Sequence, residues 1–551
     1  MSQTHRSVVK ELGDFTTTLR VLPISLLAVV IGAVASGVAW LLLKLIGLFT
    51  NFFYYGRFGT ALSSPAGNHL GVFAIAVPVI GALIVGIMAR YGSERIRGHG
   101  IPEAIESILM SGSRVQPKLA ILKPISAAIS IGSGGPFGAE GPIIMTGGAF
   151  GSLIAQLFHL TNTERKTLLV AGAAAGMSAV FATPLAAVLL AVELLLFEWK
   201  PRSAIPVALA SVTAGIGRRY ILGLGPLFPV PPHPLAIGLY GILSCLVVGL
   251  LAGAFSALMT QGVYAAEDLF HKLPIHWMWW PAIGGVFVGI GGLIFPQALG
   301  VGYDVIGFLL KGNVALHLIL GVLLVKASIW IISLGSGTSG GVVAPLLMTG
   351  AALGALESLF LPHYGAGFWE LVSMGATLAG TMACPFTGIV FAIELTHDLN
   401  MLLPLLIACF LSYSMVVLLL KRSILTEKIA RRGYHLSREY ALDPLEILFV
   451  RDVMRPAEMV EEPLATDTVA YSNDPLRVVV YRMVETGLTT LPVLKSWNEP
   501  ELIGVVSLND LLQARTKNFA EENERETVLR LRRPIRSAAE TSTSTIELPL
   551  P

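Results

Sequence analysis

Apolar residues dominate this chain in long unbroken runs, and polar residues gather at the ends of the runs and in the connections between them. The runs at residues 21–49, 71–88, 235–253 and 402–420 are each long enough to cross a lipid bilayer. This pattern predicts a polytopic all-α membrane protein. After residue 423 the apolar runs stop, and residues 444–515 have the mixed spacing of a small soluble α/β module.

One apolar run follows a loop crowded with glycines. Residues 132–142 read GSGGPFGAEGP and lead directly into apolar residues 143–158. Glycine adopts backbone conformations that other residues resist, and Pro142 stands at the predicted first position of a helix. Such a loop presents free N–H groups at the positive end of a helix, which favours an anion.

The glycine-rich loop has a second copy. Residues 335–345 read GSGTSGGVVAP, so the two terminal prolines are 345 − 142 = 203 residues apart, and PIIMTG after the first loop matches PLLMTG after the second. The segment PLAAVLLAVEL at 184–194 also resembles PFTGIVFAIEL at 385–395. Broken apolar elements at matching places in two halves are typical of a transporter whose binding site lies between the repeats.

Composition narrows the class of function. The 551 residues are 54% hydrophobic and 13% charged, with a mean hydropathy of +0.71. Basic residues of the first half, among them Arg97 and Lys123, are interpreted as connections or helix ends. The formal charge of +2 gives no reason to expect nucleic acid as a partner. No H-E-x-x-H metal spacing occurs, and neither a metal site nor an intramembrane enzyme using Glu140 or His99 is expected.

Three short segments resemble the chloride channel/exchanger (CLC) family: GHGIP at 98–102, GAEGP at 138–142 and GVVAP at 341–345. The resemblance covers roughly residues 20–435. It implies a homodimer with one pore per subunit, built from two inverted repeats whose helix N-termini converge on an anion near mid-membrane. The anion-binding residues that it implies are Gly98, His99, Gly100, Ile101, Pro102, Gly138, Ala139, Gly141, Gly341, Val342, Val343, Ala344 and Leu425.

The resemblance also implies that Glu140 is a gate that occupies an anion position and swings away. The physical argument agrees, because a carboxylate inside a membrane is costly and is by default a functional hypothesis. Since Glu140 precedes the predicted helix, the N–H groups that would hold an anion can also hold its charged form, and protonation would release it. The alternative is an acid that merely satisfies the unpaired N–H groups of a helix start.

Three positions depart from the family pattern. His99 stands where a serine usually contacts the anion, and either a direct contact or a side chain turned aside is compatible with the sequence. Leu425 stands where many members have a tyrosine. Leu194 stands where proton-coupled exchangers often have a second glutamate. Glu193, which recurs as Glu394, is expected to be structural, whereas Glu198 is either a substitute proton path or an exposed helix-end acid.

These departures favour passive chloride conduction over proton-coupled exchange. A chloride/proton antiporter with a non-standard proton path and a fluoride exporter remain as alternatives. A divalent-cation transporter with a regulatory module is a more remote one, because cation selection would need converging carboxylates or carbonyls.

Residues 448–515 resemble a CBS domain through VRDVM at 450–454, GLTTLPV at 487–493 and GVVSLND at 504–510. In that family the last segment supplies a hydroxyl and an aspartate for the ribose of an adenine nucleotide, which here would be Ser507 and Asp510. The alternative is a domain that stabilises a dimer and binds no nucleotide. No other cofactor is implied. CBS modules work in pairs, so the single copy is expected to pair with that of a second subunit.

The sequence thus predicts a multi-pass cell-membrane protein whose partners are chloride or another small anion, the lipid bilayer and a second subunit. The CBS domain and both termini are expected in the cytoplasm. The expected organisation is an N-terminal segment at 1–20, membrane repeats at 21–225 and 235–435 joined by a connector at 226–234, a linker at 436–447, a CBS domain at 448–515 and a charged tail at 516–551.

Overall fold

The computed structural model describes residues 17–223, 225–312, 314–432, 445, 448–456, 468–496 and 499–514. The chain divides into two compact units, Met1–Arg438 and Glu439–Pro551. The expected tail at 516–551, most of the linker at 436–447 and the first sixteen positions of the N-terminal segment lie outside the described residues.

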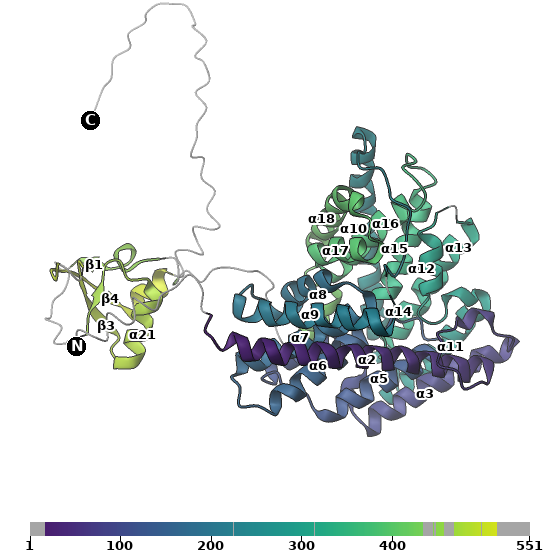
Figure 1. The fold of residues 1–551 in the computed structure, drawn as a ribbon, viewed down its shortest axis with the longest axis horizontal. Coiled ribbons are helices and arrows are strands. Elements are labelled where there is room, and N and C mark those ends of the chain that lie inside the picture. The colour runs from purple at the N-terminus through teal and green to yellow at the C-terminus, as the bar shows by residue number, and fades with distance from the viewer. Residues whose placement is uncertain are drawn as a thin grey trace, which may run out of the picture. The chain divides into compact units, whose positions relative to one another are not determined.

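The first unit is helical (Figure 1). Its first half contains α2 (Val21–Tyr55), α3 (Ala76–Tyr91), α4 (Ile101–Met110), α5 (Pro117–Gly132), α6 (Glu140–Gln156), α7 (Asn162–Phe181), α8 (Pro184–Leu190) and α9 (Pro201–Ile221). Its second half contains α10 (Leu239–His271), α11 (Trp280–Ile294), α12 (Tyr303–Leu309), α13 (Leu316–Leu320), α14 (Ala327–Gly335), α15 (Val343–Glu357), α16 (Phe368–Met382), α17 (Pro385–Thr396), α18 (Leu402–Leu419) and α19 (Ile424–Arg431).

Short helices of other kinds join these elements. Two are π-helical, η4 (Ala191–Leu196) and η7 (Gly321–Lys326). The others are 3-10 turns: η1 (Pro65–Gly67), η2 (Gly71–Ile75), η3 (Glu94–Ile96), η5 (Trp277–Trp279), η6 (Pro296–Ala298) and η8 (Leu399–Met401).

Six helical segments in the described part of the chain are long and apolar enough to cross a membrane: Val21–Tyr55, Gly71–Tyr91, Leu239–His271, Trp277–Ile294, Leu316–Gly335 and Leu399–Arg431. The prediction of a polytopic helical membrane protein is confirmed. Several other apolar helices are shorter, including α15 and α17. Within a bilayer a helix can end only where its unpaired backbone groups are buried in protein or line a cavity.

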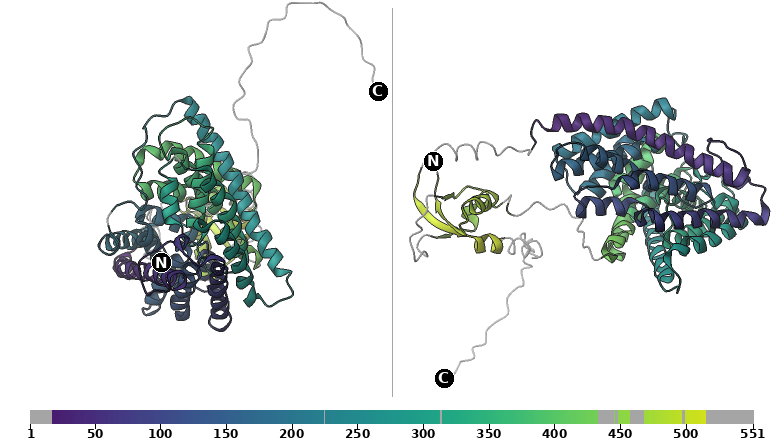
Figure 2. Two further views of the ribbon diagram at one scale, coloured as in Figure 1. Left: turned by 90° about the vertical axis from the view of Figure 1, so that its right-hand side faces the viewer. Right: turned by 90° about the horizontal axis from the view of Figure 1, so that it is seen from below.

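The two halves repeat one packing pattern. The long helix α2, at the purple end of the colour scale in Figures 1 and 2, packs against α5, α7 and α9. Helix α10 packs in the same way against α14, α16 and α18. The pair α6 and α7 likewise corresponds to the pair α15 and α16, and α8 of the first half packs against α17 of the second. These matching neighbours agree with the repeat seen in the sequence.

The helices that follow the two glycine-rich loops begin earlier than the prolines predicted. Helix α6 begins at Glu140 and α15 at Val343, so Pro142 and Pro345 are each the third helical residue. Proline is tolerated there because the N–H groups of a first helical turn have no intrahelical partner. Glu140 is therefore the first residue of its helix, and the expectation that it precedes the helix is wrong.

The second unit contains a sheet of four strands in the order β1-β4-β3-β2. Strand β4 (Leu502–Ser507) pairs antiparallel with both β1 (Arg455–Pro456) and β3 (Thr490–Leu494), and β3 pairs parallel with β2 (Ala470–Tyr471). Helix α21 (Leu476–Thr486) contributes Leu476 and Val479 to the apolar core of this unit. The small soluble α/β module is confirmed.

Candidate anion-binding site

Three glycine-rich loops, two from the first repeat and one from the second, meet in the interior of the helical unit. Gly138 and Gly341 exchange backbone hydrogen bonds of 3.2 and 2.9 Å. The Gly98 N–H donates to the Thr338 carbonyl at 3.1 Å, and the Gly340 N–H donates to the Gly98 carbonyl at 3.4 Å. The loops that sequence placed far apart are therefore held against one another by backbone bonds.

All the predicted anion-binding residues are buried, and most lie in these loops or in the helix starts that follow them. They occupy the start of α4 (Gly98, His99, Gly100, Ile101, Pro102), the start of α6 (Gly138, Ala139, Gly141) and the start of α15 (Gly341, Val342, Val343, Ala344). Leu425 lies apart from them on α19, where its neighbour Ile424 lines a cavity.

Close packing of the loops requires glycine at Gly100. Its φ of +91° is a conformation that residues with a Cβ rarely adopt, and a Cβ there would lie 2.6 Å from the Gly141 carbonyl oxygen. A side chain at Gly100 would thus push the start of α4 away from the start of α6. Three helix N-termini, those of α4, α6 and α15, are in this way brought to one place, where their N–H groups favour a negative charge.

The Glu140 carboxylate lies between the two repeats. Its residue is 1% exposed, and its Oε2 occupies the space where a Cβ on Gly138 would be. A Cβ on Gly341, from the second repeat, would lie 2.9 Å from the same oxygen. The backbone amides of Glu140 and Ala344 face the carboxylate. The Tyr303 hydroxyl donates to Oε1 at 3.4 Å, while Oε2 has no well-aligned partner among the described residues.

Two buried lysines, Lys123 and Lys326, occupy matching places in the two repeats, 326 − 123 = 203 residues apart. The Lys123 ammonium group donates to the carbonyls of Ile96 and Gly98, both at 2.8 Å. The Lys326 ammonium group donates to the carbonyls of Ala298 and Gly300 at 2.9 and 2.7 Å. Lys123 thus fixes the glycine loop at 98–102, and Lys326 fixes the glycine loop at 300–304. Each lysine leaves a positive charge behind its loop.

The interpretation of Lys123 as a connection or helix end is wrong, because it lies inside α5 and is fully buried. The sequence did carry a signal for it. Lys123 and Lys326 have the same spacing as the two glycine-rich loops, and a charge repeated at that spacing inside apolar sequence is a functional hypothesis.

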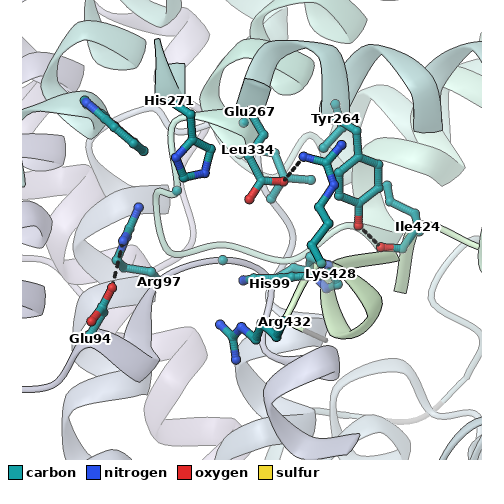
Figure 3. Close-up of a pocket in the computed structure, with 16 residues that line it drawn as sticks. Glu94, Arg97, His99, Tyr264, Glu267, His271, Leu334, Ile424, Lys428 and Arg432 are labelled. Carbon is teal, nitrogen blue, oxygen red and sulfur yellow. Dashed lines mark hydrogen bonds and ion pairs between the residues drawn. The ribbon is translucent and has the colours of Figure 1, made fainter. Parts of the chain in front are cut away.

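A cavity of about 400 Å³ lies against the glycine loop at 98–102 (Figure 3). His99 lines it, is 3% exposed, and has an Nδ1 without a hydrogen-bond partner among the described residues. Figure 3 shows Arg97 and His271 on one side and Tyr264 and Ile424 on another. Four cationic side chains line the wall: Arg97, Lys428, Arg431 and Arg432.

Contacts with neighbouring side chains hold these cations in place. The Arg97 guanidinium lies 4.4 Å from the ring centre of Trp277 and bonds Glu94 at 3.1 Å. The Lys428 ammonium group bonds Glu103 at 2.6 Å, and Glu103 in turn accepts the Gly100 N–H at 3.0 Å. Lys428 of α19 is thereby connected to the loop that carries His99.

A second cavity, of about 170 Å³, lies against the loop at 300–304 and is lined by Tyr303 and Asp304. That loop, GVGYD, occupies the position in the second repeat that GHGIP occupies in the first, 300 − 98 = 202 residues earlier. Each repeat therefore places one cavity against its equivalent glycine loop. Sequence reasoning missed Tyr303, although the repeat spacing pointed to its loop.

The three residues considered for a proton path lie in different surroundings. Leu194 is fully buried within η4. Glu193 accepts the backbone N–H groups of Phe386 and Thr387 at the start of α17. Glu198 accepts the Ser203 hydroxyl at 3.0 Å and pairs with Arg202 at 3.4 Å.

Ser507 and Asp510 of the second unit bond to each other. The Ser507 hydroxyl donates to Asp510 Oδ2 at 2.7 Å, and the same oxygen accepts the Arg455 Nε at 3.2 Å. The two residues expected at a ribose are thus adjacent, at the end of β4 and in the helical segment that follows.

Residues 80–416, more than half of the chain, match the family model described as voltage gated chloride channel. The chain belongs to the voltage gated chloride channel (CLC) family. Residues 450–517 match the CBS domain model, so the second unit is a CBS domain. The protein is therefore a CLC membrane protein, of a family that transports anions, with a C-terminal CBS domain.

Relatives and solved structures give a consistent picture. The H(+)/Cl(-) exchange transporter ClcA of Klebsiella pneumoniae (strain 342) is 31% identical over 420 residues, which cover 70% of this chain and 84% of that protein. A slow cyanobacterial Cl-/H+ antiporter has a similar fold, with a TM-score of 0.64, 21% identity, and coverage of 76% of this chain and 99% of that one. A CLC-type fluoride/proton antiporter has a TM-score of 0.62 and 21% identity, covering 72% and 96%.

Proposed function

We propose that this CLC protein exchanges chloride for protons across the cell membrane, with one pathway per subunit and Glu140 as both gate and proton carrier. The observation that carries the proposal is the place of the Glu140 carboxylate. It lies between Gly138 of the first repeat and Gly341 of the second, where the starts of α4, α6 and α15 converge. A negative carboxylate and a negative anion compete for that place.

The charges around the site favour an anion over a cation. Lys123 and Lys326 are buried behind the glycine loops at 98–102 and 300–304. Four cations and two carboxylates, Glu94 and Glu267, line the cavity next to His99, so positive charge is in excess there. A divalent-cation transporter would need several converging oxygen ligands. Among the described residues Glu140 is the one carboxylate whose oxygens lie against Gly138 and Gly341.

We propose exchange, whereas the sequence alone favoured passive conduction. The ClcA relative, which is 31% identical over 70% of this chain, bears the name of a proton/chloride exchanger. Leu194 then requires another route for the proton. Glu193 is occupied at the start of α17, so Glu198 is the proposed substitute.

The proposal extends to the assembly. A second subunit would supply the CBS partner that a single module lacks, and the CBS domain would lie in the cytoplasm. An adenine nucleotide would be held there by Ser507 and Asp510.

The test is chloride efflux from proteoliposomes with external pH recorded at the same time, with and without a potassium/valinomycin clamp. Proton movement driven uphill by a chloride gradient supports exchange. Chloride flux without proton movement under both conditions overturns exchange and returns the passive reading. Replacing chloride by fluoride identifies a fluoride exporter if fluoride alone is carried, and a Glu140→Gln sample shows whether proton movement depends on that carboxyl group.

A further inference from the structure

Tyr303 is the side chain that hydrogen-bonds Glu140 in the described part of the chain. It is the first residue of α12 and follows Gly302, whose φ is +80°. Its ring packs against Phe181 and Phe228, with ring centres 6.3 and 6.2 Å apart. The ring is thus supported on two sides, and the hydroxyl is directed at Oε1 across 3.4 Å.

The first repeat provides an internal comparison for this position. Tyr303 corresponds to Ile101, 303 − 101 = 202 residues earlier, and both are first residues of a helix after a glycine with positive φ. Both loops are fixed by a buried lysine in the same way. Since the fully buried Ile101 serves the same backbone without a hydroxyl, the fold does not require one at Tyr303.

We propose that Tyr303 is a positioning residue whose hydroxyl holds the ionised Glu140 carboxylate in its blocking position and so sets how readily the gate opens. This inference rests on the proposed function of Glu140. A donor that bonds the charged form of a carboxylate favours that form over the protonated one. The Tyr303 hydroxyl therefore opposes both release and protonation of Glu140.

The other charged groups around this pair have hydrogen-bond partners other than the Tyr303 hydroxyl, or none that involves it. Lys326 of η7 acts on Glu140 from a distance while bonding Ala298 and Gly300. Arg218 of α9 acts on Tyr303 while bonding the carbonyls of Val180 and Gly223. Asp304 lies next to Tyr303 on the cavity wall. None of these groups donates a hydrogen bond to Glu140, so Tyr303→Phe isolates one bond.

The experiment compares chloride efflux against pH for the full-length protein in proteoliposomes, as wild type, Tyr303→Phe, Glu140→Gln and the double variant. Tyr303→Phe is expected to raise efflux about threefold at alkaline pH, well above the midpoint, which is the equivalent of a midpoint moved about half a unit to higher pH. In the Glu140→Gln background the same substitution is expected to change nothing. Tyr55→Phe is the control, because it also removes a tyrosine hydroxyl, but one that bonds the Ser64 carbonyl and not Glu140.

An unchanged or lower efflux in correctly folded Tyr303→Phe overturns the inference, and so does an equal change in the Glu140→Gln background, which would indicate packing. Tyr303→Met, which also lacks the hydroxyl, decides the matter if Tyr303→Phe does not fold. If Glu140→Gln itself leaves efflux and its pH response unchanged, the proposed function fails. If Glu140→Gln acts and Tyr303→Phe does not, only the role of Tyr303 fails.

Discussion

Glu193 and Glu394 each cap the start of a helix in the opposite repeat. Glu193 accepts the N–H groups of Phe386 and Thr387, the second and third residues of α17, at 3.2 and 2.9 Å. Glu394, inside α17, accepts those of Leu185 and Ala186, the second and third residues of α8, at 3.0 and 2.8 Å. The two carboxylates therefore satisfy four N–H groups that have no intrahelical partner, and they join the repeats reciprocally.

This exchange predicts a structural effect without a transport effect. Glu193→Ala and Glu394→Ala should each lower the free energy of unfolding by about 2 kcal/mol, because charged hydrogen bonds to helix N–H groups are lost. The proton-to-chloride ratio should stay that of wild type. Thermal unfolding in detergent and flux in proteoliposomes measure the two quantities.

The matched control is Glu164→Ala, which removes a bond of 2.8 Å from the Thr161 N–H at the exposed start of α7, together with an ion pair of 2.7 Å to the exposed Arg20. Its effect should be smaller, because water can replace the lost bond. Loss of proton movement in Glu193→Gln, with unchanged stability, would identify Glu193 as a proton carrier and contradict the capping role.

Glu140→Gln should raise chloride flux and remove the dependence of flux on pH. The amide cannot ionise, so it imitates the protonated gate at every pH. The measurement is initial chloride efflux between acidic and alkaline pH, where wild type should be faster at the acidic end.

Glu357→Gln is the control for that substitution. Glu357 is also a buried glutamate, but it ends α15, thirteen residues after Ala344, which is about 20 Å along the helix. It should keep the wild-type pH response. A pH response that persists in Glu140→Gln would exclude Glu140 as the gate.

His99→Ser should change the order in which anions are carried if the imidazole lies on the anion path. Its Nδ1 has no partner among the described residues and its ring lines the cavity, so an anion there would gain or lose one donor. We expect a change of about threefold or more in the chloride-to-nitrate flux ratio, since one hydrogen bond is worth about 1 kcal/mol. His317→Ser, at an exposed position on α13, is the control. An identical series in His99→Ser would place the ring outside the path.

Lys123→Met and Lys326→Met should both destabilise the protein, by about 3 kcal/mol each. Each substitution leaves two buried carbonyls of a glycine loop without a donor. Because both also remove a positive charge behind the anion site, chloride flux should fall in protein that remains folded. Thermal unfolding and efflux of the two variants, with the exposed Lys311→Met as control, provide the comparison. Wild-type stability in either variant would contradict the role given to its lysine.

The sequence by itself determined the membrane class, the duplicated architecture, the CBS domain and the glycine loops. Apolar runs and repeat spacing are local or periodic properties, so they can be read along the chain. The recurrence of Glu193 as Glu394 in the second repeat could also be read in this way.

Only the tertiary structure decided which side chains meet. Tyr303 is 163 residues from Glu140 in sequence, and Lys428 is 325 residues from Glu103. Lys123 carries a charge that local sequence assigns to a helix end, yet carbonyls from a separate loop satisfy it inside the protein. The structure also placed the starts of α6 and α15 two residues before the prolines, because a proline marks the first turn of a helix and not its first residue. Such contacts depend on how the repeats pack, and no local pattern encodes that packing.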